Sequence, residues 1–133
     1  MIVIDSSALV AIATKEPPDW LDLLAVLQGD QVAYLSPINY VETGIILVTR
    51  GVFAGPAQID RWLEGFGVEV CNESDLSKDA LTAYLAFGKG RHPAGLNLAD
   101  CFAYALAKTL DLPLLYKGDD FARTDIRSAL QPT

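Results

Sequence analysis

The first strand constrains the fold more than any other stretch, because it carries no polar alternation. Residues 2–4 read Ile-Val-Ile, and the acid Asp5 and the hydroxyl residues Ser6 and Ser7 follow directly. Such a strand is typical of parallel sheets, whose strands are buried on both faces. Ligands of these sheets bind beyond the carboxyl ends of the strands. Asp5 is therefore predicted to lie where a site can form, although a turn or cap role explains a single acid equally well.

Strands and helices alternate along the rest of the chain. Ser6 or Ser7 is the predicted N-cap of the first helix, and Ser36 followed by Pro37 is a strong start for the third. Asn97 is the predicted N-cap of the helix at residues 98–108. This alternation predicts an α/β fold with three layers, in which helices cover both faces of a mostly parallel central sheet. The further strands are expected at residues 32–35, 68–71 and 112–116, and the further helices at 20–27, 37–50, 57–66, 80–87 and 98–108.

The composition indicates one compact domain over residues 1–133. The chain is 51% hydrophobic and 20% charged, which supports a core and argues against disorder. It has no apolar run long enough to cross a bilayer and no basic start typical of a signal peptide. We therefore expect a cytoplasmic protein that does not engage a membrane.

Cysteine and histidine offer little to a metal site. Cys71 and Cys101 are not part of a CxxC pair, and His92 is the single histidine. A Cys/His zinc site is thus not expected. Both cysteines have apolar neighbours, which favours buried free thiols.

The net charge of −7 by itself argues against nucleic-acid binding, which usually requires a basic surface. Carboxylates gathered in one pocket change this expectation, because a divalent cation would neutralise them and invert the local electrostatics. An acidic surface also suits a basic partner protein.

Acids stand at four notable positions. Asp5 and the pair Asp119–Asp120 each follow a strand of the same sheet, and Asp100 begins the helix before the last strand. Glu42 lies on a helix, residues 37–50, that is apolar on nearly all sides and is therefore expected to be largely buried. Oxygen ligands without histidine or thiolate suit Mg²⁺ or Mn²⁺. A cation held this way activates water and stabilises phosphoryl displacement.

The acids at two of these positions also have ordinary roles. Asp100 falls in the first turn of its helix, where a carboxylate stabilises the helix dipole. Asp119 and Asp120 follow Gly118 and can form an exposed turn. The hypothesis of a metal site therefore depends on whether these acids converge.

Four stretches together resemble the PIN domain, and more closely the VapC toxins of bacterial VapBC toxin–antitoxin pairs. The resemblance spans essentially the whole chain, and the last two stretches are its most specific part. They are VIDSSAL (3–9), NYVET (39–43), GLNLADC (95–101) and LLYKGDDFARTDI (114–126).

This resemblance implies a PIN-like α/β/α fold and a Mg²⁺-dependent endoribonuclease that a cognate antitoxin inhibits. By position, Asp5 and Asp100 would be the main metal ligands and catalytic acids, and Glu42 would complete the site directly or through water. Many family members place the fourth acid two residues earlier than this chain does. We favour Asp120 over Asp119 for that position, and Ser6 or Ser7 would orient Asp5.

Three basic side chains are candidate RNA contacts, because cations neutralise phosphates. Lys89 and Arg91 lie in the glycine- and proline-rich loop 88–97, and Lys117 follows the last strand. A solvated loop and a snorkelling lysine are the ordinary alternatives. His92 has no evident carboxylate partner and is not assigned as a general base.

A homodimer and an antitoxin are the expected protein partners. Trp20, Leu24, Phe53 and Trp62 are candidate contacts, although core packing is the more ordinary role of each. An antitoxin segment carrying arginine would fit an acidic pocket.

Two other interpretations remain open. A receiver-like phosphoacceptor domain shares the parallel sheet, the strand-end acids and a lysine after the last strand, here Lys117. It would carry paired acids where Ser6 and Ser7 stand. A catalytically inactive PIN-fold binding module is the second alternative, and the full set of acids argues against it.

Overall fold

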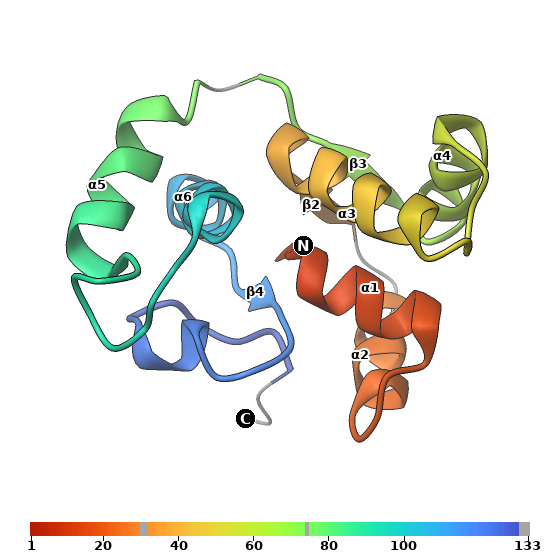
Figure 1. Cartoon of the computed structure of the whole chain (residues 1–133), viewed down its shortest axis with the longest axis horizontal. Coiled ribbons are helices and arrows are strands. Elements are labelled where there is room, and N and C mark those ends of the chain that lie inside the picture. The colour runs from red at the N-terminus through yellow and green to blue at the C-terminus, as the bar shows by residue number, and fades with distance from the viewer. Residues whose placement is uncertain (30–31, 74, 131–133) are drawn as a thin grey trace.

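The computed structural model describes residues 1–29, 32–73 and 75–130. Their centre is a four-stranded sheet of order β3-β2-β1-β4, in which every pairing between named strands is parallel. Helices cover both faces (Figure 1), which confirms the predicted three-layer α/β/α architecture. The strands are β1 (Ile2–Ile4), β2 (Ala33–Leu35), β3 (Val68–Val70) and β4 (Leu114–Leu115), and the helices are α1 (Ser6–Thr14), α2 (Trp20–Leu27), α3 (Pro37–Thr49), α4 (Pro56–Gly65), α5 (Ser77–Phe87), α6 (Leu98–Leu110) and the short 3₁₀ helix η1 (Phe121–Arg123).

The sheet divides the core into two clusters. Because successive side chains of a strand point to opposite faces, Ile2 and Ile4 pack with α1, α2 and α4, whereas Val3 packs with α5 and α6. All three side chains of β1 are buried. This agrees with the absence of polar alternation, and it places the end of β1 near the middle of the sheet edge.

The helix starts follow the predicted cap chemistry in two of three cases. Ser36 caps α3 through its hydroxyl, with Pro37 in the first turn, and Asn97 caps α6 in a capping box with Asp100. The third prediction was wrong, because Asp5, not Ser6 or Ser7, is the N-cap of α1. Asp5 therefore ends the strand and also begins the helix.

Apolar faces of two helices are exposed. On α3 the buried side chains are Asn39, Thr43 and Leu47, while Val41 and Ile45 are 52% and 62% exposed. The expectation that α3 is largely buried was therefore wrong. On α5 the small Ala80 and Ala83 are buried against α6, and Leu81, Tyr84 and Leu85 face outward. Each helix carries more apolar surface than the core can cover.

The aromatic candidates for partner contacts belong mainly to the interior. Phe53 and Trp62 pack against the cluster of α1, α2 and α4, and so does Leu24. The Trp62 ring also contacts Phe66, with ring centroids 5.5 Å apart. Trp20 is half-buried, with the Lys15 ammonium 5.9 Å from the centre of its ring.

Both cysteines are free thiols; Cys101 is buried and Cys71 half-buried. Among the described residues, no helix has the length and apolar character needed to cross a membrane.

Candidate active site

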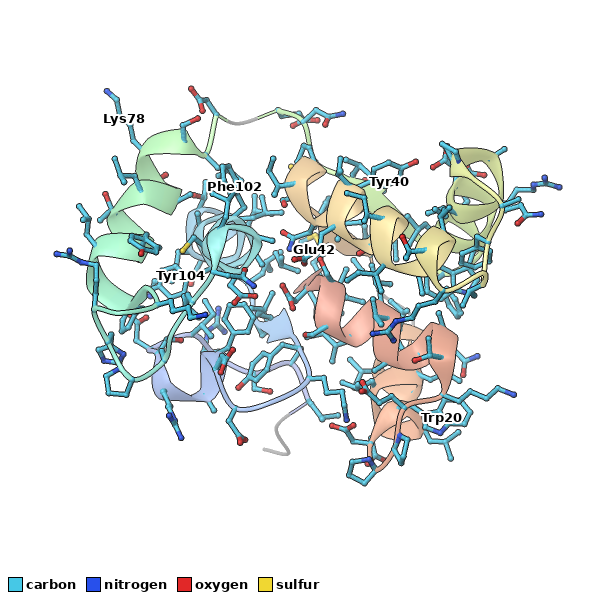
Figure 2. All side chains as sticks on the ribbon, viewed as in Figure 1. Trp20, Tyr40, Glu42, Lys78, Phe102 and Tyr104 are labelled. Atoms are coloured by element: carbon cyan, nitrogen blue, oxygen red, sulfur yellow. The ribbon has the colours of Figure 1, made fainter. Side chains whose placement is uncertain are left out.

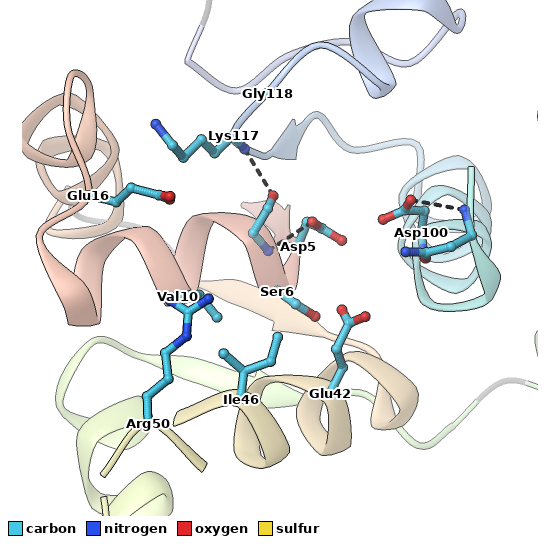
Figure 3. A pocket seen from close by; sticks show the side chains of 12 residues that line it. Asp5, Ser6, Val10, Glu16, Glu42, Ile46, Arg50, Asp100, Lys117 and Gly118 are labelled. Atoms are coloured by element: carbon cyan, nitrogen blue, oxygen red, sulfur yellow. Dashed lines mark hydrogen bonds between the residues drawn. The ribbon is translucent and has the colours of Figure 1, made fainter. Parts of the chain in front are cut away.

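A pocket of about 380 Å³ opens at the carboxyl edge of the sheet. Three of the predicted acids line it: Asp5 from the end of β1, Glu42 from α3 and Asp100 from the first turn of α6 (Figure 3). These residues are far apart in the sequence, so only the parallel topology brings them together. The structure thus confirms that these three acids converge.

Asp5 is the most deeply buried of the acids, with 2% of its surface exposed. Its Oδ2 accepts the backbone N–H of Ser7 at 2.9 Å, and its Oδ1 accepts the side-chain amide of Asn39 at 3.3 Å. Burial raises the pKa of Asp5 to about 7; hydrogen bonding from Ser7 lowers it, and the charges of Asp100 and Glu42 raise it further. A cation in the pocket would remove this cost.

Asp100 forms part of the capping box at the start of α6, and it also lines the pocket. Its Oδ2 accepts the Asn97 N–H at 3.0 Å, and the Asn97 side chain accepts the Asp100 N–H at 2.9 Å. Burial raises the pKa of Asp100 to about 6; the bond from Asn97 lowers it, and the negative charges of Glu42 and Asp120 raise it. Capping and lining the pocket are therefore compatible roles for this residue.

Glu42 is half-buried and projects from α3 into the pocket. Figure 2 shows its side chain near the centre of the molecule, between α3, α1 and α6. Its side chain rises from α3 toward Asp5, whereas Asp100 comes from α6 (Figure 3). Glu42 is thus placed to meet a ligand held between Asp5 and Asp100.

The fourth acid is less closely associated with the pocket. Asp119 and Asp120 are both exposed, and the loop contributes Lys117 and Gly118 to the pocket lining. Asp120 is near enough for its charge to raise the pKa of Asp100, which favours it over Asp119.

The donor set of the pocket fits a hard divalent cation, because it consists of carboxylates that repel one another. Within residues 1–29, 32–73 and 75–130, no three His, Cys, Asp or Glu side chains are close enough to form a ready-made metal cluster.

The two serines have different partners. The Ser7 hydroxyl accepts the backbone N–H of Lys117 at 3.0 Å, which ties α1 to the segment after β4. The Ser6 hydroxyl donates to the carbonyl of Asn39 at 3.2 Å and accepts its amide at 3.1 Å. Ser7 therefore contacts Asp5 through its main chain, and Ser6 is linked to Asp5 through Asn39.

The predicted RNA contacts are not gathered at the pocket. Lys117 lines it, but its ammonium is bound to Asp19 at 2.6 Å and to the carbonyl of Pro17 at 3.1 Å. Lys89 and Arg91 are exposed on the loop before α6 and do not line the pocket. The Arg91 Nε donates to the Leu85 carbonyl at 3.1 Å.

Sequence reasoning missed several residues of this site, among them Arg50, Asn39 and the acid Glu16. Arg50 lines the pocket two turns beyond Glu42 (Figure 3) and has no ion pair among the described residues. The spacing of four residues between Glu42, Ile46 and Arg50 could have identified it, because this spacing places all three on one helix face. Asn39 is a buried amide that contacts Asp5. Its position could have identified it, because Asn39 is a polar residue one turn before Glu42 on a helix with mostly apolar residues.

A parallel sheet between helical layers, with three acids at its carboxyl edge, defines a class of protein as well as a fold. The family profile described as the PIN domain matches residues 2–127 of this chain. That match covers every element of the sheet and every acid of the pocket.

Individual relatives of known name place the chain in one group within the PIN domain family. Ribonuclease VapC of Mycolicibacterium smegmatis is 45% identical over 126 residues, which cover 94% of this chain and 97% of the relative. The crystal structure of Mycobacterium tuberculosis VapC20, a sarcin–ricin loop cleaving toxin, has a TM-score of 0.73 at 16% identity, covering 95% of this chain and 96% of that one. A toxin–antitoxin complex from Klebsiella pneumoniae contains a similar chain, with a TM-score of 0.65 at 16% identity and coverage of 94% and 93%. The chain therefore belongs to the VapC ribonucleases of the PIN domain family.

Proposed function

We propose that this protein hydrolyses RNA phosphodiester bonds and is the toxin of a toxin–antitoxin pair. The observation that carries the proposal is the convergence of Asp5, Glu42 and Asp100 in one pocket. Its relatives are named ribonucleases, and those names agree with what a pocket of carboxylates can do. A cytoplasmic location is part of the proposal, because RNA substrates are found there.

The proposed cofactor is Mg²⁺, with Mn²⁺ as a substitute. Asp5, Asp100 and Glu42 would hold it, and Asp120 would contribute from the loop after β4. When bound, the cation supplies an activated water and offsets the negative charge that builds up on the phosphate oxygens. The hydrogen bonds of Asp5 with Ser7 and Asn39, and of Asp100 with Asn97, would hold these carboxylates in place. The burial of Asp5 would limit its access to bulk water.

Arg50 is the proposed contact for the RNA backbone inside the pocket. It lies eight residues from Glu42 on the same helix, or about 12 Å along the helix axis. A phosphate near the scissile one can therefore meet its guanidinium while the scissile phosphate lies at the acids. Lys89 and Arg91 would contact RNA that extends beyond the pocket, and Lys117 would need to release Asp19 to do so.

Two protein partners complete the proposal. A basic antitoxin segment carrying arginine would fit the acids of the pocket. A second copy of this chain would cover the exposed apolar face of α3, formed by Val41, Ile45 and Val48, because such a patch is costly to leave in water.

The test compares Asp5→Asn and Asp100→Asn with the wild-type protein in cleavage of RNA at fixed Mg²⁺. Both variants should lose at least about 100-fold in rate, as removal of a group that stabilises the transition state typically does. Asp22→Asn, an exposed acid on α2, is the matched control and should keep full activity. Near-normal cleavage by the two pocket variants would reject the assignment.

The same preparations separate the alternatives. Phosphorylation of Asp5 by a small phosphodonor such as acetyl phosphate would favour a receiver-like domain. Antitoxin binding without any metal-dependent cleavage by the wild-type protein would favour an inactive binding module.

A further inference from the structure

The buried amide of Asn39 joins the segments that carry the acids. Its Nδ2 donates to Asp5 Oδ1 at 3.3 Å, to Ser6 Oγ at 3.1 Å and to the carbonyl of Ala99 at 3.2 Å. Asn39 is fully buried. Ala99 directly precedes Asp100, and Glu42 lies one turn further along α3. One side chain therefore contacts Asp5 itself, contacts the main chain next to Asp100, and lies on the helix that carries Glu42.

The orientation of this amide is set by Ser36. The Ser36 hydroxyl donates to Asn39 Oδ1 at 2.5 Å, and the Asn39 backbone N–H donates to the same hydroxyl at 3.0 Å. A flipped amide would turn its oxygen toward the Asp5 carboxylate and the Ala99 carbonyl, which are both acceptors. The N-cap of α3 thus directs the NH₂ group toward the acids.

We propose that Asn39 is a positioning residue that sets the separation of Asp5 and Asp100 and thereby the affinity of the pocket for a divalent cation. Metal ligands must be held closely, and groups that bond to them typically change metal affinity or activity by about 10- to 100-fold when removed. This inference rests on the proposed metal-dependent function.

Three similar side chains would not do the same. A serine is too short to reach both Asp5 and Ala99, and a glutamine is one methylene longer than the packed space around a fully buried residue allows. An aspartate would have the right shape but would set a third negative charge against Asp5 and an acceptor against Ala99.

The test measures Mn²⁺ binding directly, by calorimetry and by the loss of the free-ion electron paramagnetic resonance signal. The variants are Asn39→Ala and the milder Asn39→Ser, and Thr43→Ala is the matched control. Thr43 is also fully buried on α3, but its hydroxyl has no hydrogen-bond partner among the described residues and so does not bond to the acids. Circular dichroism and thermal melting without metal establish that each variant is folded.

Asn39→Ala should weaken Mn²⁺ binding by about 10- to 100-fold, and Asn39→Ser should do so to a smaller extent. Thr43→Ala should bind Mn²⁺ as the wild type does. In RNA cleavage at low Mg²⁺, the Asn39 variants should lose kcat with little change in KM. The kcat loss should shrink as Mg²⁺ is raised.

Wild-type Mn²⁺ affinity in a folded Asn39 variant would overturn the proposal and leave Asn39 a purely structural residue. If Asn39→Ala does not fold, the same decision rests on Asn39→Ser. Failure of the wild-type protein itself to bind Mn²⁺ would instead reject the proposed metal site, so the two failures are distinguishable.

Discussion

Ionisation of Asp5 should lower the free energy of unfolding of the metal-free protein at neutral pH. Asp5→Asn should remove this loss, because the asparagine side chain carries no charge. Burial raises the pKa of Asp5 from 3.8 to about 7. A raised pKa means that the folded state binds the proton more tightly than the unfolded state does. Stability from this group is therefore fully present at about pH 4 and below, and it is lost as the pH rises from about 4 to about 7.

The size of the effect follows from the shift. A displacement of roughly three pH units at about 1.4 kcal/mol per unit gives a loss of about 4 kcal/mol in the free energy of unfolding. Because Asp5 is 2% exposed, little of this is reduced by solvent screening. That loss is a large share of the total stability of a typical domain, so it should be measurable.

The assay is urea unfolding at pH 4.5, 6.0 and 7.5 in EDTA, followed by the fluorescence of Trp20 and Trp62. The wild-type protein should lose more stability across this range than Asp5→Asn does, and the gap between the two curves should approach about 4 kcal/mol. Adding Mg²⁺ at pH 7.5 should restore much of the wild-type stability and do little for the variant. Asp22→Asn should follow the wild-type curve.

Parallel stability curves for the wild-type protein and Asp5→Asn in EDTA would refute this reasoning. They would mean that Asp5 stays solvated enough to ionise at no cost, and that its burial has no electrostatic consequence.

Three further predictions concern other parts of the molecule. Arg50→Ala should weaken binding of an uncleavable RNA, and it should lower the slope of the logarithm of the binding constant against the logarithm of salt concentration by about one. Arg61→Ala on α4 is the control and should change neither. Equal slopes for Arg50→Ala and the wild-type protein would exclude a phosphate contact at Arg50. Thr43→Val should raise the free energy of unfolding by about 1 kcal/mol, because the buried hydroxyl has no described hydrogen-bond partner; a loss of stability in urea titrations would contradict this. Ile45→Glu should shift the protein toward the monomer in light scattering, because it places a charge on the exposed face of α3; an unchanged mass would argue against that interface.

Local sequence signals determined much of this protein. A strand without polar alternation predicted the buried β1, and Ser36-Pro37 and Asn97 predicted two helix starts. These features depend on backbone geometry and on neighbours within a few residues. The acids Asp5, Glu42 and Asp100 were also found in this way, because each stands at a strand end or on an apolar helix.

The choice of buried face was decided only by the tertiary structure. Apolar periodicity shows that α3 has apolar stripes, but it does not say which stripe meets the sheet. The core accepted the face of Asn39, Thr43 and Leu47, on which the Asn39 amide bonds to Asp5 and to the main chain next to Asp100. The stripe of Val41 and Ile45 was left exposed.

The partners of the polar side chains also depended on the tertiary structure. Lys117 is bound to Asp19, almost a hundred residues away in the sequence, and Asn39 bonds to both Asp5 and Ala99. Such bonds form between segments that are joined only by the folded sheet. The sequence by itself therefore identified three acids that line the pocket and the helix caps Ser36 and Asn97. The fold decided which side chains hold the acids in place, because hydrogen bonds require distances that only packing sets.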